Sequence, residues 1–166
     1  MTVLKKKVAF CDKRKITVPS GGFQEDSVAM EVQHPKRWNL ESPSRYLARV
    51  SVYEGEKKVD EYDTPFGIRT IEFTHDNGFL LNGHRVQIKE GVCNHHDLGA
   101  LGAAVSEAAL RRQIKILQSF GCNAIRTSHN PPAPELLTLA DKMGMLVMDE
   151  AFDCWQYGKK EYDYGH

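Results

Sequence analysis

The sequence predicts a multi-domain chain in which an antiparallel β part precedes an α/β part. Residues 1–73 contain short segments in which apolar and polar residues alternate, as in strands with one buried face. Residues 74–166 instead alternate short apolar runs with segments whose apolar residues recur at helical spacing. A hairpin signal, Asn82-Gly83, lies shortly after the junction. We therefore expect two domains, residues 1–73 and residues 74–166.

The first part is expected to form a small antiparallel sandwich. Apolar and polar residues alternate along residues 46–53, residues 54–58 form a polar turn, and a return strand begins at residues 59–62. Segments 8–10 and 28–32 are two further strand candidates. Short strands separated by turn residues at this spacing favour a sandwich.

The second part begins with a hairpin and continues with a helix. Residues 79–81 and 84–88 flank Asn82-Gly83, a pair suited to the positive φ angles of a type I′ turn. Ser106 can cap a helix whose apolar residues recur every three to four positions. Gly121 is then expected to end this helix.

Two more strands and a second helix follow. Residues 123–127 are typical of a short strand, and the prolines in 131–134 open a helix that Gly144 ends. Residues 145–148 form an unbroken apolar run, as expected of a parallel strand buried on both faces. The series of strands and helices predicts parallel pairing with right-handed crossovers.

The composition excludes several classes of protein. Lys and Arg number 22, as do Asp and Glu, so the net charge is zero. A neutral chain lacks the excess positive charge that binds nucleic acid or an anionic membrane surface. No apolar run approaches the ~18 residues of a membrane helix. The four cysteines include no Cys-x-x-Cys pair, so they form no zinc framework. We expect neither a nucleic-acid nor a membrane partner.

Each part is shorter than a complete domain of the fold that its sequence pattern predicts. The second part has room for about three parallel strands, whereas an eight-stranded α/β barrel needs roughly 250 residues. The first part is likewise shorter than a sandwich domain of ~100 residues. We therefore expect the chain to be a piece of a longer protein.

Polar residues gather at the predicted carboxyl ends of the three parallel strands. Asn94-His95-His96-Asp97 follow the first strand, Arg126 to Asn130 the second, and Asp149-Glu150 the third. Carboxyl ends of parallel strands meet at one edge of a sheet, where ligands bind in α/β proteins. The sequence therefore predicts a shared site at this edge.

Three other interpretations of these residues stay open. The ligand types of a metal-dependent hydrolase occur at His95, His96, Asp97, His129 and Asp149. Adjacent histidines on an extended segment point to opposite faces, however, which counts against a shared metal. A nucleotide-binding loop at residues 99–104 would lack the glycine spacing of known phosphate loops. The chain could also be a non-catalytic carbohydrate-binding or scaffold module.

One motif carries a family resemblance. Residues 123–131 read Asn-Ala-Ile-Arg-Thr-Ser-His-Asn-Pro, followed by Leu136-Leu137, Asp141 and the run Gly-Met-Leu-Val-Met at 144–148. This pattern resembles the signature of glycoside hydrolase family 2. It departs from the family's β-galactosidase prototype at Asn130, where the prototype has tyrosine. Residues 64–73, 81–97 and 148–153 also resemble successive segments of that family.

The resemblance implies a fold and an activity. The fold is a partial immunoglobulin-like β-sandwich followed by the first β-α-β-α-β units of a (β/α)8 TIM barrel. The activity is that of a retaining glycosidase, with the β-galactosidase type as the first expectation, which acts on terminal non-reducing β-glycosidic bonds of a carbohydrate. The family also includes glucuronidases and mannosidases, so the sugar stays open.

The resemblance also implies roles for residues of this chain. The implied substrate-binding residues are His95, Arg126, His129, Asn130, Asp149 and Glu150. Of these, His95 and His129 would contact sugar hydroxyls, and Arg126 would orient the nucleophilic carboxylate. The resemblance implies no cofactor. It carries over no metal either, because Cys154-Trp155-Gln156 stand where the prototype draws on residues for magnesium.

The catalytic residues are expected outside this chain. Retaining hydrolysis needs two carboxyl groups ~5–5.5 Å apart. In the family both are glutamates, at the ends of the fourth and seventh barrel strands, which would lie beyond residue 166. We therefore expect no catalytic residue here and no activity from the isolated chain. An open barrel edge also predicts self-association.

Overall fold

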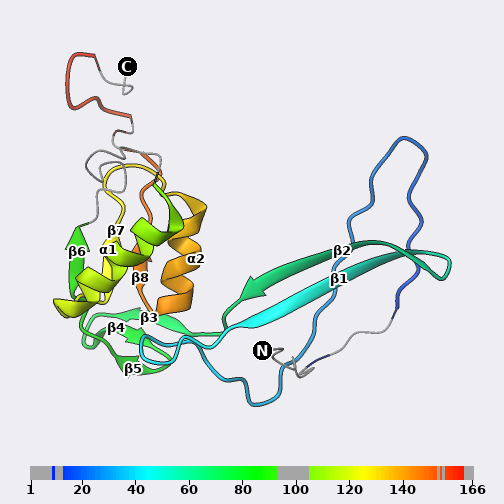
Figure 1. Cartoon of the computed structure of the whole chain (residues 1–166), viewed down its shortest axis with the longest axis horizontal. Helices are drawn as coiled ribbons and strands as arrows, with labels where there is room; N and C mark the ends of the chain where they lie inside the picture. The colour runs from blue at the N-terminus through cyan, green and yellow to red at the C-terminus, as the bar shows by residue number, and fades with distance from the viewer. Residues whose placement is uncertain (1–8, 10–12, 93–104, 153, 155, 163–166) are drawn as a thin grey trace. The chain divides into compact units, whose positions relative to one another are not determined.

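The structure is a computed structural model that describes residue 9 and residues 13–92, 105–152, 154 and 156–162 (Figure 1). By contacts between Cα atoms the chain divides into two units, residues 1–36 and residues 37–166. The described residues of the first unit form neither a helix nor a strand. Those of the second unit form eight strands and two helices.

The strand expected at residues 28–32 is absent, so that prediction was wrong. These residues belong to no helix or strand and have no paired neighbour in the part of the chain that the structure describes, and the side chains of Val28 and Met30 are about half exposed. Apolar alternation stabilises a strand only when the strand pairs and one of its faces is buried. The other candidate, residues 8–10, lies mostly outside the described residues.

The first sheet is the hairpin of β1 (Tyr46–Glu54) and β2 (Lys57–Phe66). The predicted alternation is confirmed, since Val50 pairs with Tyr62 on one face while Arg49 pairs with Asp63 on the other. Both strands are largely exposed: Val50 is 61% and Tyr62 71% accessible. On the polar face, Arg49 donates two hydrogen bonds to Asp63, of 2.7 and 2.8 Å.

The second sheet joins β3 (Ile71–Thr74), β4 (Gly78–Leu81) and β5 (His84–Arg85) in antiparallel order. The predicted turn between β4 and β5 is confirmed: the φ angles of Asn82 and Gly83 are 56° and 81°. These are the two positive values that a type I′ turn requires, and glycine adopts them without a steric cost.

The third sheet is parallel and joins β6 (Glu90–Val92), β7 (Ala124–Arg126) and β8 (Leu146–Met148) in that order. The helices α1 (Glu107–Ser119) and α2 (Pro134–Met143) connect its strands, and Figure 1 shows the two helices side by side along the sheet. The predicted β-α-β-α-β series is therefore confirmed.

The helix boundaries follow the expected signals. The Ser106 hydroxyl accepts a hydrogen bond from the Ala109 N–H (3.4 Å), and Gly121 follows the helix with a φ of 82°. The second helix begins at Pro134 and ends at Met143. Its C-cap, Gly144, has a left-handed φ of 73°, and the Gly144 N–H donates to the Ala140 carbonyl oxygen. Both C-terminal glycines thus stand where the chain needs a positive φ.

The two faces of the parallel sheet are covered differently. The helices cover one face and form a core of seven buried residues: Leu110, Ile114, Ile125, Leu136, Leu139, Ala140 and Met145. On the other face, Ala124 and Leu146 pack with Trp38 and Leu81 at the amino ends of the strands. Because strand side chains alternate, Arg126 and Met148 share this second face at the carboxyl end.

The prediction that residues 145–148 are buried on both faces is confirmed only for part of this run. Met145 and Leu146 are buried, but Met148 is 56% exposed. Met148 lies beyond the cover that Trp38 provides at the amino ends, because Leu146 is its neighbour on the same face and closer to Trp38. The second face is therefore closed at the amino ends and open where the polar residues gather.

Trp38 links the start of the second unit to the parallel sheet. Its indole N–H donates to the Asp141 carbonyl oxygen at 2.8 Å, and its own carbonyl oxygen accepts from the Asn82 side chain at 2.9 Å. The Arg69 guanidinium lies 4.6 Å from the centre of the indole ring, a cation–π distance. The indole is 2% exposed, so it belongs to the core.

Candidate functional site

The polar residues after β7 and β8 lie side by side because the two strands are parallel and in register. Arg126, the last residue of β7, pairs with Met148, the last residue of β8. The Thr127 N–H continues the ladder by donating to the Met148 carbonyl oxygen at 3.0 Å. The expected common edge of these two strands is therefore present, and the chain leaves it at Thr127 and Asp149.

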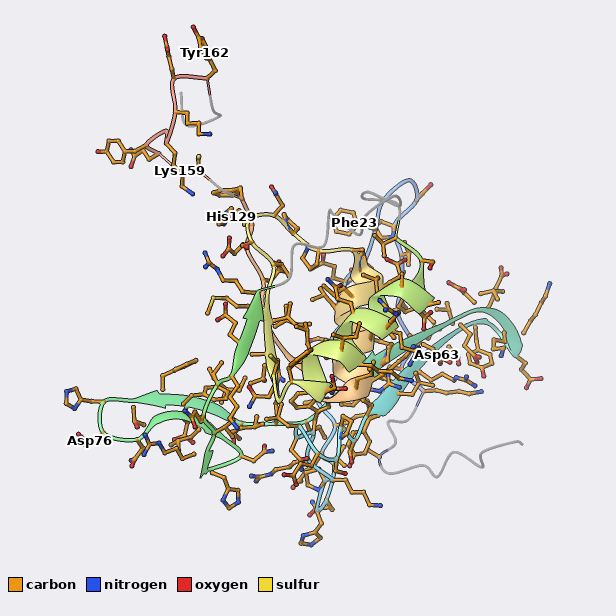
Figure 2. The ribbon with its side chains drawn as sticks, turned by 60° about the vertical axis from the view of Figure 1, so that its left-hand side comes forward. Phe23, Asp63, Asp76, His129, Lys159 and Tyr162 are labelled. Atoms are coloured by element: carbon orange, nitrogen blue, oxygen red, sulfur yellow. The ribbon has the colours of Figure 1, made fainter. Side chains whose placement is uncertain are left out.

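Glu150 joins two of the predicted site residues. One carboxylate oxygen accepts a hydrogen bond from Arg126 Nε, and the other lies 3.0 Å from His129 Nδ1. The Glu150 side chain is 18% exposed, against 39% for Arg126 and 48% for His129. The carboxylate thus lies deeper than the two groups that it binds. Figure 2 shows His129 in this region, past the ends of the strands.

The charge of Glu150 is set by Arg126. The hydrogen bond from Arg126 lowers the pKa of the Glu150 carboxyl below its ordinary value, and a weaker contribution from His129 acts in the same direction. Partial burial opposes this effect without cancelling it. Glu150 is therefore a carboxylate at neutral pH, able to accept hydrogen bonds but holding no proton for a general acid to donate.

Thr127 binds the backbone of Glu150 through a buried hydroxyl. Its side chain is fully buried, and its hydroxyl oxygen accepts a hydrogen bond from the Glu150 N–H at 3.0 Å. The same oxygen lies 3.4 Å from the Met148 carbonyl oxygen and 3.4 Å from Asp149 Oδ1, either of which can accept its proton. The hydroxyl therefore ties the exits of β7 and β8 together.

A tight turn brings His129 to Glu150. The Asn130 N–H donates to the Thr127 carbonyl oxygen at 3.0 Å, which closes the turn 127–130, and the peptide bond between Ser128 and His129 is cis. Asn130 is half-buried in this turn. The turn reverses the chain after β7, so that the His129 ring faces Glu150, two residues beyond the end of β8.

The structure thus brings together five of the six predicted residues. Arg126, His129 and Glu150 are in direct contact, Asp149 reaches them through Thr127, and Asn130 belongs to the turn. The sixth, His95, lies with Asn94, His96 and Asp97 outside the described residues. Sequence reasoning missed Thr127, although a short hydroxyl residue directly after a strand-end arginine is the signal that could have indicated it.

The motif also reaches the opposite end of β7. The Asn123 side chain accepts from the Lys89 N–H at 2.7 Å and donates to the Gln87 carbonyl oxygen at 2.9 Å. Its backbone carbonyl accepts from the Leu146 N–H at 2.9 Å. Asn123 therefore fixes the register of all three parallel strands, on which the alignment of their carboxyl ends depends.

The described residues contain no group of three or more His, Cys, Asp or Glu side chains that could hold a metal ion, and no helix among them could cross a bilayer. Three ligands of the metal alternative, His95, His96 and Asp97, lie outside the described residues. A hollow of about 110 Å³ is lined by Trp38, Arg45, Gly67, Arg69 and Asp141, none of which belongs to the strand-end cluster.

Comparisons with known families agree with this geometry. The model of the glycosyl hydrolases family 2 TIM barrel domain matches residues 72–159, and a second model, described as glycosyl hydrolases family 2, matches residues 3–69. These matches confirm the predicted fold class, a family 2 β domain followed by the start of a TIM barrel.

Individual proteins agree as well. The chain is 50% identical over 135 residues to a β-galactosidase of Bacteroides ovatus, which covers 81% of this chain and 16% of that protein. It is 42% identical to a putative β-glucuronidase of Formosa agariphila, with 84% of this chain and 14% of that protein covered. The chain therefore spans about one sixth of the length of these relatives.

Solved structures give the same result. A family 2 member from Bacteroides cellulosilyticus superposes with a TM-score of 0.76 at 43% identity, over 82% of this chain and 17% of that one. A β-glycosidase from Bacteroides vulgatus has a TM-score of 0.76 at 41% identity, over 81% and 17%. A β-glucuronidase from Parabacteroides merdae has a TM-score of 0.68 at 26% identity, over 75% and 15%.

Proposed function

Because the chain belongs to glycoside hydrolase family 2, we propose that it is part of a retaining glycosidase that hydrolyses terminal non-reducing β-glycosidic bonds. The observation that carries the proposal is the cluster at the carboxyl ends of β7 and β8, where Glu150 binds Arg126 and His129. In barrel enzymes this end of the strands holds the active site. The proposed domains are residues 1–73 and 74–166, and the two family matches meet close to that boundary.

Arg126 and His129 have the chemistry that a glycosidase pocket needs. The contact with Glu150 uses Arg126 Nε, and the guanidinium carries four further N–H donors on its terminal nitrogens. Those donors suit a second carboxylate, in the role of the nucleophile that Arg126 would orient. His129 is 48% exposed, so its ring is accessible to a sugar hydroxyl. His95, Asn130 and Asp149 complete the proposed binding set.

A β-galactoside is the proposed substrate. The relative at 50% identity is a β-galactosidase, which supports this choice. A β-glucuronide is the second candidate, because relatives at 42% and 30% identity are named as β-glucuronidases. The higher identity to the β-galactosidase decides between the two candidates in this proposal.

The isolated chain is proposed to be inactive. Retaining hydrolysis needs a protonated acid and a nucleophile ~5–5.5 Å apart. Glu150 can supply neither role easily, because it is ionised and both of its oxygens face cationic or N–H partners. The 166 residues should therefore give no saturable turnover of chromogenic β-galactosides or β-glucuronides. Turnover that survives extensive purification would contradict this proposal.

The activity itself is tested on the full-length protein that carries this chain. We expect hydrolysis of an aryl β-galactoside with retention, seen by proton NMR as first release of the β-anomer. Arg126→Lys keeps the charge but loses the planar fork, so kcat should fall roughly 100-fold. A full-length protein that binds sugars but hydrolyses none would favour the rival function, a non-catalytic carbohydrate-binding module.

A further inference from the structure

We infer that Glu150 is a positioning residue that fixes the orientations of Arg126 and His129, and that the buried Thr127 hydroxyl holds Glu150 in place. The inference rests on the proposed function, in which Arg126 and His129 face the substrate. The family resemblance implied only that Glu150 is one of the substrate-binding residues, whereas here it acts through two named partners, Arg126 and His129. It also adds Thr127, which that resemblance did not include, to the functional residues.

The geometry of the carboxylate supports this role. Its two oxygens face different partners, Arg126 through one and His129 through the other. Both partners come from β7 and the turn after it, whereas Glu150 follows β8. A single side chain therefore bridges two strand exits. Since Glu150 is less exposed than either partner, a ligand that reaches this edge meets the guanidinium and the imidazole first.

The position of Glu150 is itself fixed by the fold. Its backbone N–H is bound by the Thr127 hydroxyl, which is buried completely and contacts the end of β8. A buried hydroxyl with several partners has a single favourable rotamer, because another rotamer would leave buried polar groups unpaired. The chain of contacts thus runs from the sheet through Thr127 to Glu150 and from Glu150 to the two exposed groups.

The contact with Glu150 has a chemical consequence for His129. The ring nitrogen that faces the carboxylate is Nδ1, and a carboxylate can only accept a hydrogen bond. The neutral imidazole must therefore carry its proton on Nδ1, which leaves Nε2 as an acceptor. His129 would then accept a hydrogen bond from a sugar hydroxyl. Without Glu150 the Nδ1–H tautomer loses this acceptor.

This tautomer is a measurable signature of positioning. We propose to record the ¹⁵N shifts of the His129 ring in the 166-residue chain, in mildly alkaline buffer where an ordinary imidazole is neutral. The Nδ1–H tautomer should predominate in the wild type. In Glu150→Ala its population should fall at least about twofold, and the Arg126 Nε–H resonance should lose its charge-assisted downfield shift. An unchanged tautomer ratio in Glu150→Ala would overturn the inference.

Thr127 variants test the second half of the inference. Thr127→Ser keeps the hydroxyl and should keep the wild-type ratio, whereas Thr127→Val removes it and should shift the ratio toward that of Glu150→Ala. Glu107→Gln is the matched control, because the Glu107 carboxylate pairs with Arg111 on α1, away from the strand-end residues, and its loss should leave the ratio unchanged. A wild-type ratio in a Thr127→Val or Thr127→Ala variant with a native circular-dichroism spectrum would overturn the role of Thr127.

The readout separates this inference from the proposed activity. The tautomer measurement involves no sugar and no turnover. If the full-length protein hydrolyses β-galactosides while Glu150→Ala leaves the His129 tautomer unchanged, only the positioning role fails. If the tautomer shifts as expected but the full-length protein is inactive, the positioning role stands and the glycosidase proposal fails.

Discussion

Glu150 and Arg126 show how neighbouring strand ends can produce an ion pair that spacing along the chain does not indicate. The two residues are 24 positions apart, and only the parallel register of β7 and β8 brings them into contact. The family motif pointed to Arg126 and His129. It could not indicate which carboxylate they contact, because that depends on the turn at residues 127–130 and on the rotamer of Glu150.

The first prediction concerns the titration of Glu150. Its pKa is lowered in the folded protein, chiefly by Arg126, so the pair stabilises the fold fully above the ordinary glutamate pKa. This contribution should be lost as the pH falls through the lowered pKa, because protonation then removes the charge. Carbon-13 NMR of the side-chain carboxyl should show Glu150 titrating at a higher pH in Arg126→Gln than in the wild type.

Glu61 provides an internal control for that titration. Its pKa is also lowered, but mainly by the Lys58 ammonium on the β1–β2 hairpin. Arg126→Gln should therefore leave the titration of Glu61 unchanged while that of Glu150 moves. Equal movement of both carboxyls, or of neither, would contradict the assignment of the shift to Arg126.

At the level of the helices and strands, local signals were reliable where they specify a backbone conformation. Asn82-Gly83, the Ser106 cap and the glycines after both helices all predicted features that the structure contains. Alternation alone was less reliable, as residues 28–32 show. A pattern of side chains indicates which face could be buried, but a partner for that face depends on distant parts of the chain.

The second prediction compares two glycines at helix ends. A Cβ atom at Gly144 would lie 2.0 Å from the Leu40 carbonyl oxygen, whereas one at Gly121 would have no atom within 4 Å. Both residues have a positive φ, so Gly121→Ala should cost roughly 1–2 kcal/mol from backbone strain alone. Gly144→Ala should cost at least about 2 kcal/mol more, because backbone must move to admit the methyl group.

Chemical denaturation of the two variants measures this difference. The free energy of unfolding should decrease for both, with the larger decrease for Gly144→Ala. Equal decreases would mean that residues near Leu40 move away from Gly144 at little cost. In that case the close approach seen here would not contribute to the stability of the second unit.

For the whole molecule, the third prediction concerns self-association. The outer edges of β6 and β8 have no paired strand among the described residues, and Met148 is 56% exposed beside one of them. Open strand edges and exposed apolar side chains promote association. The 166-residue chain should therefore form larger species as its concentration increases, as measured by sedimentation velocity.

Two lysine variants locate the associating surface. Met148→Lys places a charge beside the edge of β8 and should reduce association. Tyr62→Lys changes the exposed β1–β2 hairpin, which is 71% accessible at this position, and should have less effect. A single monomeric species at every concentration would contradict the prediction.

The order and pairing of the helices and strands could be predicted from the sequence, whereas the contacts between residues far apart in the chain could not. The parallel strands, both helices and the clustering of Arg126 with Glu150 at one edge follow from periodicity, caps and the strand-end rule. The role of Thr127 and the cover over Ala124 and Leu146 depend on packing between distant segments. Such packing leaves no periodic signal in the chain.

Trp38 determines where the protein can be shortened. The TIM-barrel match starts at residue 72, yet the indole that seals the amino ends of β7 and β8 comes from more than thirty positions upstream, before the whole β1–β2 hairpin. A truncation at residue 72 would remove that indole and expose the apolar side chains that it covers, Ala124 and Leu146, to solvent. Dissection of this protein should instead cut before Arg37, where the contacts between residues thin out.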